Sequence, residues 1–334
     1  MPDRMQARRA LLLHAGWGDG VATFLAGDAS DRTYDRLSLP GRTAVLMDAP
    51  PGKGDDPAMF LAVAAHLLGL GLSAPQLIAQ DADHGFLLLE DFGDAVFARV
   101  LAADPLLEPV LYLAAVRALD RLQTSAPMPD LPSLSSREWA AAAAFALTHY
   151  RAAITDSPVD QTAFLTCMSD LIEGESGADH VMILRDFHAE NLIWLPDRTG
   201  AARAGLLDFQ LAQMGHPVYD VVSLLQDARR DVQPETCRLT RRAFCDANGM
   251  TEAAFDRACA VWGAQRALRI LGVFVRLALQ SGKMSYLALM PRVWQHLQAN
   301  LHHPALSSLQ KTCDVLLPAP SSANLAMIRH KVGL

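Results

Sequence analysis

Short, largely apolar and β-prone segments are separated by polar turn signals along the chain up to residue 93. Such segments, bounded by Gly, Pro and Asp, are typical of β-strands. The turn signals include GDAS at residues 27–30, LPG at residues 39–41 and DADHG at residues 81–85. The pattern predicts an antiparallel meander accompanied by two helices. We expect strands at residues 21–25, 32–39, 43–47, 76–79 and 86–89, and helices at residues 4–14 and 58–68.

Beyond residue 94 the apolar residues recur with the spacing of amphipathic helices. Helical patterns cover residues 96–150, with a polar loop at residues 124–136, and residues 161–173; helices also dominate from residue 218 onward. Short strand-like pieces at residues 181–184, 192–195 and 204–207 interrupt them. We therefore predict an α+β, bilobal chain. A small β-rich lobe spans residues 1–93, with a hinge at about residues 90–93, and a larger, mostly helical lobe spans residues 94–334.

The composition narrows the class of protein. The chain has 334 residues, 51% hydrophobic and 19% charged, without a low-complexity run, so it has enough apolar residues for a sizeable core. The amino-terminal apolar burst is too short for a signal peptide, and Arg269 and Arg276 interrupt the apolar stretch at residues 267–279, which argues against a membrane span. Five cysteines without CxxC spacing indicate reduced thiols in a cytoplasmic protein and no zinc framework.

One stretch concentrates polar chemistry between apolar runs: VMILRDFHAENLIWL, Val181 to Leu195. One interpretation is a buried hairpin whose loop is merely polar. A second is a metal hydrolase that uses His180, His188 and His216, although no HEXXH motif is present and the histidines lack ligand spacing.

A third interpretation is phosphoryl transfer. Asn191 follows Asp186 by five residues, the spacing of the kinase loop H-R-D-x-x-x-x-N, and Asp208 begins a DFQ triplet after the next strand-like pieces. Asp186 is suited to accept the proton of an attacking hydroxyl. Asn191 and Asp208 supply the oxygen atoms that the hard cation Mg²⁺ prefers. The ordered set, placed after a β-rich lobe, favours a kinase that uses ATP and Mg²⁺.

The same stretch resembles the aminoglycoside phosphotransferase and choline kinase superfamily, whose motif is H-G-D-L-H-P-x-N. LRDFHAEN matches it at Asp186, His188 and Asn191 and departs from it at Leu184 and Arg185. The resemblance implies a protein-kinase-like fold, with Asp186 as the catalytic base and Arg185 and His188 supporting its loop.

Two further segments are similar to this superfamily. LLLEDFGD at residues 87–94 resembles its hinge, which implies that backbone groups around Glu90, Asp91 and Phe92 hold the adenine edge of ATP. HPVYDVVSLLQD at residues 216–227 resembles the segment in which an Asp, here Asp220, braces the catalytic loop.

A narrower resemblance is to the bacterial anomeric sugar kinases of cell-wall recycling. It is carried by GDASDRTYDRL, VLMDAPP, LRDFHAENLIWL and the long segment at residues 265–297. It implies ATP-dependent phosphorylation of the C1 hydroxyl of N-acetylmuramate and N-acetylglucosamine in peptidoglycan recycling.

The chain departs from generic kinases at the phosphate site. The third predicted strand, TAVLMDAP, has no Lys, and the helix at residues 58–68 lacks the Glu that would pair with it. Arg32 and Lys53 are the candidate replacement cations, and the turn from Gly27 to Ser30 offers backbone N–H groups to phosphate. A plain hairpin turn explains Gly27 and Ser30 equally well. A pseudokinase that binds nucleotide without turnover is the alternative explanation of the missing Lys.

The charge distribution bears on the acceptor. Residues 1–185 contain 13 Lys and Arg against 24 Asp and Glu, whereas residues 186–334 contain 16 against 12. This spread excess does not form the dense patch of a nucleic-acid binder, and it disfavours a polycationic acceptor such as an aminoglycoside. Arg266 and Arg269 on the helical segment at residues 265–280 either form a solvated face or bind the lactyl carboxylate of N-acetylmuramate.

The sequence thus predicts a cytoplasmic kinase acting on an amino sugar, without nucleic-acid or membrane partners. Aminoglycoside, choline or homoserine kinases and a pseudokinase regulator are the alternatives. The preferred sugar and the oligomeric state stay open.

Overall fold

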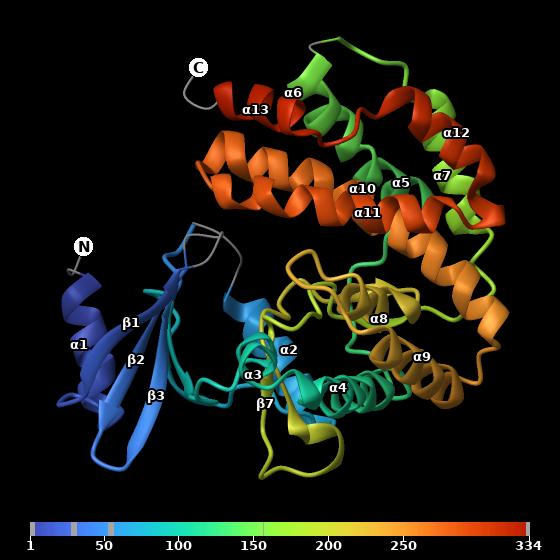
Figure 1. The fold of residues 1–334 in the computed structure, drawn as a ribbon. Helices are drawn as coiled ribbons and strands as arrows, with labels where there is room; N and C mark the ends of the chain where they lie inside the picture. The colour runs from blue at the N-terminus through green and yellow to red at the C-terminus, as the bar shows by residue number, and fades with distance from the viewer. Residues whose placement is uncertain (1–3, 28–31, 53–56, 156, 332–334) are drawn as a thin grey trace. The chain divides into compact units, whose positions relative to one another are not determined.

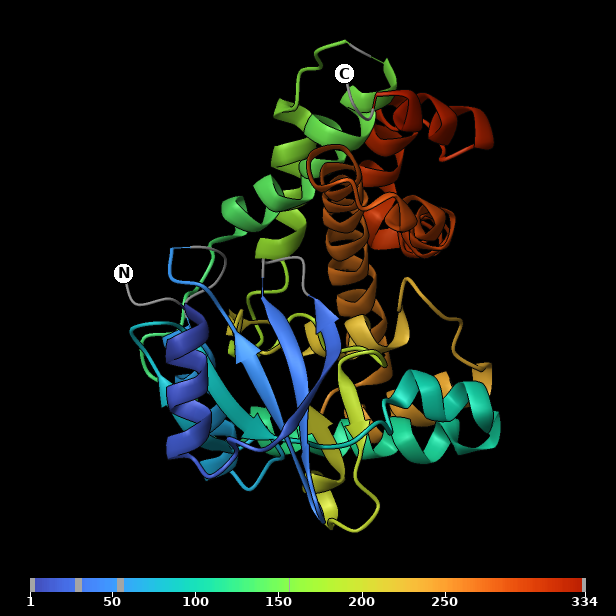
Figure 2. The ribbon, with the colours of Figure 1, turned by 90° about the vertical axis from the view of Figure 1, so that its left-hand side faces the viewer.

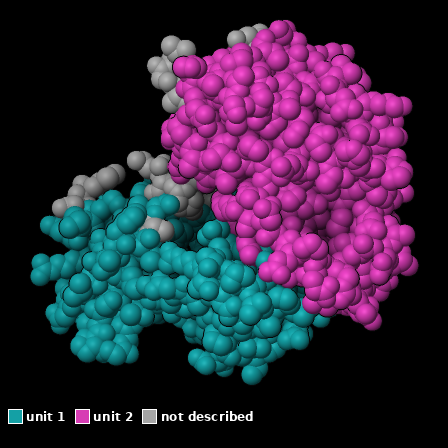
Figure 3. All heavy atoms as spheres, viewed as in Figure 1, with its two compact units in different colours: residues 1–128, 189–212 teal, residues 129–188, 213–334 magenta. Residues whose placement is uncertain are grey.

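The computed structural model describes residues 4–27, 32–52, 57–155 and 157–331. The chain forms two compact units, coloured separately in Figure 3. Unit 1 comprises residues 1–128 and 189–212, and unit 2 comprises residues 129–188 and 213–334. The chain therefore passes from unit 2 back to unit 1 between His188 and Ala189, inside the motif that carries the chemistry. The predicted lobes, residues 1–93 and 94–334, do not coincide with these two units. That the first lobe binds the nucleotide stays a prediction.

Unit 1 contains a five-stranded antiparallel sheet in the order β1-β2-β3-β5-β4 (Figure 1). The strands are β1 (Val21–Gly27), β2 (Thr33–Leu39), β3 (Arg42–Asp48), β4 (Leu77–Asp81) and β5 (Phe86–Glu90). The helices are α1 (Arg4–His14), α2 (Pro57–Gly69), α3 (Phe97–Ala103), η1 (Pro105–Leu107), α4 (Glu108–Gln123) and η3 (Gly200–Arg203), and a separate pair of strands is β7 (Leu192–Trp194) with β8 (Ala204–Leu206). All the predicted elements of residues 1–93 are present.

The period of two along the strands assigns the two faces of the sheet. Leu37, Ala44, Leu46, Phe86 and Leu88 form one core cluster with Ala7 and Leu11 of α1, which lies alongside the strands in Figure 2. The intervening residues belong to the opposite face, and the strand register pairs Tyr34 with Met47 and Met47 with Leu87 there. β5 is buried on both faces, as its continuous apolar run FLLL indicates.

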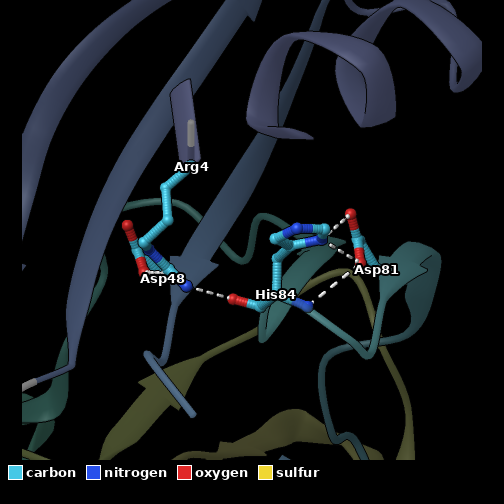
Figure 4. A network of polar contacts seen from close by, with 4 residues as sticks. All are labelled: Arg4, Asp48, Asp81 and His84. Carbon is cyan, nitrogen blue, oxygen red and sulfur yellow. Dashed lines mark hydrogen bonds and ion pairs between the residues drawn. The ribbon is translucent and has the colours of Figure 1, made fainter. Parts of the chain in front are cut away.

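A polar network fixes the amino-terminal helix to the sheet (Figure 4). Arg4 forms an ion pair with Asp48 at the end of β3 and donates to the carbonyl oxygen of His84. His84 in turn contacts Asp81 through its backbone N–H, at 3.1 Å, and its ring. The next residue, Gly85, has φ +71°, and a Cβ there would lie 1.9 Å from the carbonyl oxygen of Ala49. Only glycine fits this turn between β4 and β5.

Unit 2 is mostly helical. Its helices are α5 (Ser136–Ala143), η2 (Ala146–Arg151, a π-helix), α6 (Ala152–Thr155), α7 (Thr162–Glu173), α8 (Val218–Leu225), α9 (Pro234–Asn248), α10 (Glu252–Ser281), η4 (Met284–Leu289), α11 (Met290–Leu301), η5 (Pro304–Leu306), α12 (Ser307–Leu316) and α13 (Ser322–His330). One short pair of strands, β6 (Val181–Ile183) and β9 (Gln213–Gly215), completes it. The predicted helical character from residue 218 onward is confirmed.

The long helix α10 forms the centre of unit 2. The side chain of Thr251 accepts from the N–H of Ala254 at its start, and Gly282 ends it in the left-handed conformation, with φ 66°. By length and composition α10 alone among the described helices passes the test for a membrane span, yet 83% of its most apolar window is buried within the protein. A buried core helix meets the same criteria, and this burial accounts for its apolar sequence.

The interpretation of residues 181–195 as a plain buried hairpin is wrong. β6 pairs with β9, and β7 pairs with β8, so the two strands that bracket the motif do not pair with each other. β9 itself was not expected from the sequence, because its residues Gln213, Met214 and Gly215 include no β-branched or aromatic residue and one glycine. The loop between β6 and β7 is therefore fixed by two different partner strands rather than by a turn of its own.

Candidate active site

Unit 1 contains a cavity of about 360 Å³. Its walls come from β1, β2, β3, the segment after β5, and the residues around β7 and β8. Six residues named from the sequence line it: Gly27, Glu90, Asp91, Phe92, Asn191 and Asp208. Leu25, Val45, Phe60 and Leu89 supply apolar surface. An apolar cavity with a few convergent polar groups is the usual form of a small-molecule site.

The residues after β5 are held in place by two arginines that the sequence reasoning missed. Arg36 on β2 pairs with Asp91 through Nε, at 2.8 Å, and with Asp94 through Nη1, at 2.9 Å. Burial alone would raise the pKa of Asp91, but the Gly93 N–H and the Arg36 guanidinium outweigh it and hold this pKa below its usual value. Asp91 therefore stays ionised and fixes the turn that follows β5.

Arg198, on the connection between β7 and β8, is the second of these arginines. Its Nη2 donates to Oε1 of Glu90 at 2.6 Å and its Nη1 to Oγ of Ser73 at 2.7 Å. Its guanidinium lies 4.9 Å from the centre of the Phe92 ring. These contacts join residues about a hundred positions apart in sequence, so no local pattern points to Arg198.

Asp208 is the centre of a polar group at this cavity. It has a left-handed backbone, with φ 55°, which is uncommon for a residue other than glycine and is typical of functional sites. Nδ2 of Asn191 lies 3.4 Å from Oδ2 of Asp208, and Nε2 of Gln210 lies 2.7 Å from Oδ1. The N–H of Leu207 donates to the carbonyl oxygen of Asn191 at 3.0 Å. The fold thereby brings together two residues that were predicted to bind metal.

These side chains suit a magnesium ion. Mg²⁺ is usually bound by one or two protein oxygen ligands, with substrate phosphates and water completing the octahedron. Asp208 offers a carboxylate whose side chain is 39% exposed, and the Asn191 amide, whose oxygen and nitrogen positions are interchangeable by a flip, lies beside it. No cluster of three His, Cys, Asp or Glu occurs among the described residues, so the part of the chain described offers no support for the metal hydrolase interpretation.

A separate group of candidate residues lies within unit 2 and contains Asp186. Asp220, fully buried on α8, accepts hydrogen bonds from the backbone N–H groups of Leu184, at 2.7 Å, and Arg185, at 2.8 Å. Arg185 has φ 73°, and the N–H of Asp186 donates to the carbonyl oxygen of Leu184 at 2.9 Å. A three-residue turn of this hand is rare and strained. The Asp220 carboxylate thus holds the turn that presents Asp186.

The pKa values of the surrounding groups follow from burial. Burial raises the pKa of Asp220 to about 6, although the two backbone N–H donors oppose this shift. Burial also lowers the pKa of His188 to about 4, so its imidazole is neutral near pH 7. His188 is 7% exposed, and its Nδ1 has no hydrogen-bond partner among the described atoms. It lies within electrostatic range of Asp227 and Asp186, and its neutral ring is a packing element of the loop.

Positive charge gathers around Asp186 in unit 2. Arg266 on α10 is 6% exposed and donates from Nη1 to the carbonyl oxygen of Gln226 at 3.2 Å. Burial, followed by the neighbouring Arg269, lowers the pKa of Arg185, while Asp186 and Asp220 act in the opposite direction. Burial likewise lowers the pKa of Arg266, against the influence of Asp186. Arg269, one helical turn from Arg266, is half-buried. Arg266 and Arg269, the two candidates for acceptor binding, both lie on α10, and their role stays a prediction.

Three of the residues named from the sequence need separate mention. Ser30 and Lys53 lie outside the described residues, as does most of the GDAS turn. Arg32 is described: it is 3% exposed, and its Nη2 lies 3.8 Å from Oδ1 of Asp208.

Residues 21–260 match the phosphotransferase enzyme family. This chain belongs to that family. Four curated relatives match, and all are named N-acetylmuramate/N-acetylglucosamine kinase. The protein from Caulobacter vibrioides is 33% identical and is aligned over 95% of this chain and 97% of its own length. The protein from Pseudomonas aeruginosa is 30% identical over 90% of each.

Solved structures of other family members have the same fold. A putative aminoglycoside phosphotransferase from Ralstonia eutropha is 14% identical and covers 92% of this chain and 98% of its own, with a TM-score of 0.61. A thermostable mutant of aminoglycoside phosphotransferase APH(4)-Ia, in a ternary complex with ADP and hygromycin B, covers 86% and 97% with a TM-score of 0.59, at 14% identity. The expectation of a phosphotransferase with a β-rich amino-terminal part and a helical remainder is therefore confirmed.

Proposed function

We propose that this phosphotransferase transfers the γ-phosphoryl group of ATP to the anomeric C1 hydroxyl of N-acetylmuramate and N-acetylglucosamine, as an Mg²⁺-dependent cytoplasmic enzyme. The observation that carries the proposal is the shared name of four curated relatives that align with most of the chain. The unit 1 cavity, with its apolar walls and the groups at Asn191 and Asp208, supports a nucleotide as the phosphoryl donor. The ADP complex of a structural neighbour supports the same donor.

In this proposal Asp186 orients the sugar hydroxyl and accepts its proton as the new O–P bond forms. The Asp220 carboxylate holds the backbone of Leu184 and Arg185, so that Asp186 has little freedom to turn away. Mg²⁺ would supply positive charge that offsets the charge developing on the phosphoryl group. Asn191 and Asp208 are the residues that would hold the ion. His188 is assigned a supporting role in the loop, where its side chain is buried at 7% exposure.

The positive charge near Asp186 suits an anionic acceptor. N-acetylmuramate carries a lactyl carboxylate that N-acetylglucosamine lacks. Arg266 is almost fully buried and bonded to Gln226, whereas Arg269 is half-buried, and the structure records no hydrogen bond or ion pair for Arg269 among the described residues. We therefore assign the carboxylate contact to Arg269 and a supporting role to Arg266. A charged guanidinium and a carboxylate form stronger hydrogen bonds than neutral groups do.

The proposed activity is tested by ADP release with N-acetylmuramate, N-acetylglucosamine, kanamycin, choline and homoserine, with the phosphate position read by NMR. We expect turnover with the two sugars and phosphate at C1. Asp186→Asn should lower kcat by a factor of about 1,000 or more, while its Kd for ATP stays within about twofold of wild type. If only kanamycin or choline were phosphorylated, that compound and not an amino sugar of the cell wall would be the acceptor. ATP binding without ADP release in the presence of any of the five compounds would indicate a pseudokinase.

The Arg269 assignment has an internal control, since one enzyme acts on two sugars that differ at the carboxylate. Arg269→Gln should lower kcat/KM for N-acetylmuramate about tenfold or more and that for N-acetylglucosamine by less than about twofold. Arg276→Gln is the matched control, because Arg276 lies on the same helix but stacks over Phe145, 5.7 Å from its ring centre. Equal losses with both sugars in Arg269→Gln would contradict the assignment.

A further inference from the structure

The pocket side of β3 carries no cation. Thr43, Val45 and Met47 alternate with the residues of the α1 core, and Val45 lines the cavity. Met47 is fully buried, between Tyr34 on β2 and Leu87 on β5. A lysine on this strand would bind the phosphates in many kinases. Its absence leaves the phosphoryl groups of a bound nucleotide without a counter-charge from β3.

The residue just before the neighbouring strand supplies one. Tyr34 and Arg36 on β2 line the cavity, and Arg32 directly precedes β2, which begins at Thr33. Tyr34 pairs with Met47 across the sheet, so Arg32 lies two residues along the chain from the position opposite Met47. The Arg32 side chain is 3% exposed, and Nη2 lies 3.8 Å from Oδ1 of Asp208.

The other described cations at the cavity are engaged elsewhere. Arg36 is bonded to Asp91 and Asp94, and Arg198 to Glu90, all next to the segment that follows β5. Arg99 is 67% exposed and lies 3.6 Å from Asp94. Within the described ranges, then, Arg32 is the cation beside Asp208, the carboxylate at the proposed metal position.

We propose that Arg32 is the phosphate-binding cation of this phosphotransferase, and that it replaces the third-strand lysine from the position just before β2. This inference rests on the proposed function for its ligand, a nucleoside triphosphate. The ion pair with Asp208, whose side chain is 39% exposed, offsets part of the charge of the buried Arg32 guanidinium. A planar guanidinium is suited to two phosphate oxygens at once, whereas an ammonium group acts as a point charge. The loss of the Lys and of its usual Glu partner is then a relocation of the cation rather than a loss of phosphate binding.

The test measures the Kd of ATP, ADP, AMP and adenosine by calorimetry, without sugar, for wild type, Arg32→Gln, Arg32→Lys and Arg42→Gln. Arg42 is the matched control, since it lies on the same sheet and its Nη2 donates to the carbonyl oxygen of Gly16, away from the cavity. Arg32→Gln should weaken ATP binding by a factor of about 30 and adenosine binding by less than about twofold. Arg32→Lys should keep part of the preference for ATP over adenosine, and Arg42→Gln all of it.

An unchanged Kd for ATP, or an equal loss for ATP and adenosine, would overturn the proposal, because either result leaves the phosphates without a specific contact at Arg32. If thermal unfolding shows that Arg32→Gln is not folded, the binding data for Arg32→Lys test the proposal instead. A reduced ratio of ATP to adenosine affinity supports the proposal, and a ratio equal to that of wild type contradicts it. These binding measurements need no acceptor. A chain that phosphorylates neither sugar but binds ATP through Arg32 would refute the proposed function and leave this inference standing.

Discussion

Replacement of Asp220 by Asn separates the effect of a buried charge from the effect of two hydrogen bonds. Asp220 is fully buried, and burial raises its pKa from 3.8 to about 6. The folded protein therefore binds the proton of the Asp220 carboxyl group more tightly than the unfolded chain does. The resulting stabilisation is fully present below about pH 4 and is lost as the pH rises through about 6. Asn at this position cannot titrate, so it should remove this pH dependence.

The size of the effect follows from the two pKa values. With about 1.4 kcal/mol per pKa unit, the stability difference between wild type and Asp220→Asn should be about 2 kcal/mol more in favour of wild type at about pH 4.5 than at about pH 7.5. Asn offers one acceptor oxygen where the carboxylate offers two, so one backbone N–H loses its partner. That loss should cost about 1–3 kcal/mol at every pH. The pH-dependent and the constant contributions are thus separable.

Urea unfolding at a series of pH values measures both contributions, with fluorescence as the signal. Trp139 and Trp262 are buried in the same unit as Asp220, and the Trp139 ring centre lies 5.2 Å from that of Tyr219, so they report on its surroundings. Asp246→Asn, at a carboxylate that is 73% exposed, controls for the loss of one negative charge. A stability difference that is the same at all pH values would refute the reasoning and show that the two N–H donors hold Asp220 ionised.

Three further substitutions test other parts of the site and the fold. Arg198→Ala should raise KM for ATP about fivefold, with a smaller change in kcat, because the Phe92 ring loses the guanidinium that supports it. Initial rates at varied ATP concentrations measure both constants. Gly272→Ala should destabilise the protein by about 2–3 kcal/mol in urea unfolding, since its Cβ would lie 2.2 Å from the carbonyl oxygen of Phe145; no change would show that α10 moves freely there. Arg185→Gly should not lower the melting temperature but should reduce kcat/KM for N-acetylmuramate, and a large fall in melting temperature would contradict the idea that this residue is strained.

The elements with a clear period were predictable from the sequence. In the structure, the period of two along β2, β3 and β5 separates the residues that pack on α1 from those on the cavity side. The motif that contains Asp186 and Asn191 was recognisable because its spacing is local. The alternation also contained a signal that was not used: Arg36 lies two residues from Tyr34 and therefore belongs to the cavity side of β2.

The contacts that remained hidden are those between distant segments. The Arg198 pair with Glu90 and the Asp220 bonds to residues 184 and 185 join positions far apart in sequence, and neither has a periodic signature. The pairing of β6 with β9 was missed for the same reason, because strands of three residues acquire their partners only through tertiary packing. The π-helix η2 likewise forms where α10 approaches closely at Gly272, a constraint imposed by tertiary packing.

The two departures from the superfamily pattern have a common physical basis in charge. Glycine in the H-G-D motif suits a left-handed backbone, but this chain has Arg185 there with φ 73°, and its buried Nε has no hydrogen-bond partner among the described atoms. Strain of about 1–2 kcal/mol and a partly buried charge are both costs to stability. The charge lies in electrostatic range of Asp186 and Arg269, where an anionic acceptor gains from it. On the nucleotide side Arg32 similarly places a buried cation beside Asp208. In both cases an arginine provides a positive charge where the superfamily uses a different residue. In our proposal the anionic groups of N-acetylmuramate and ATP are the ligands that these two charges fit.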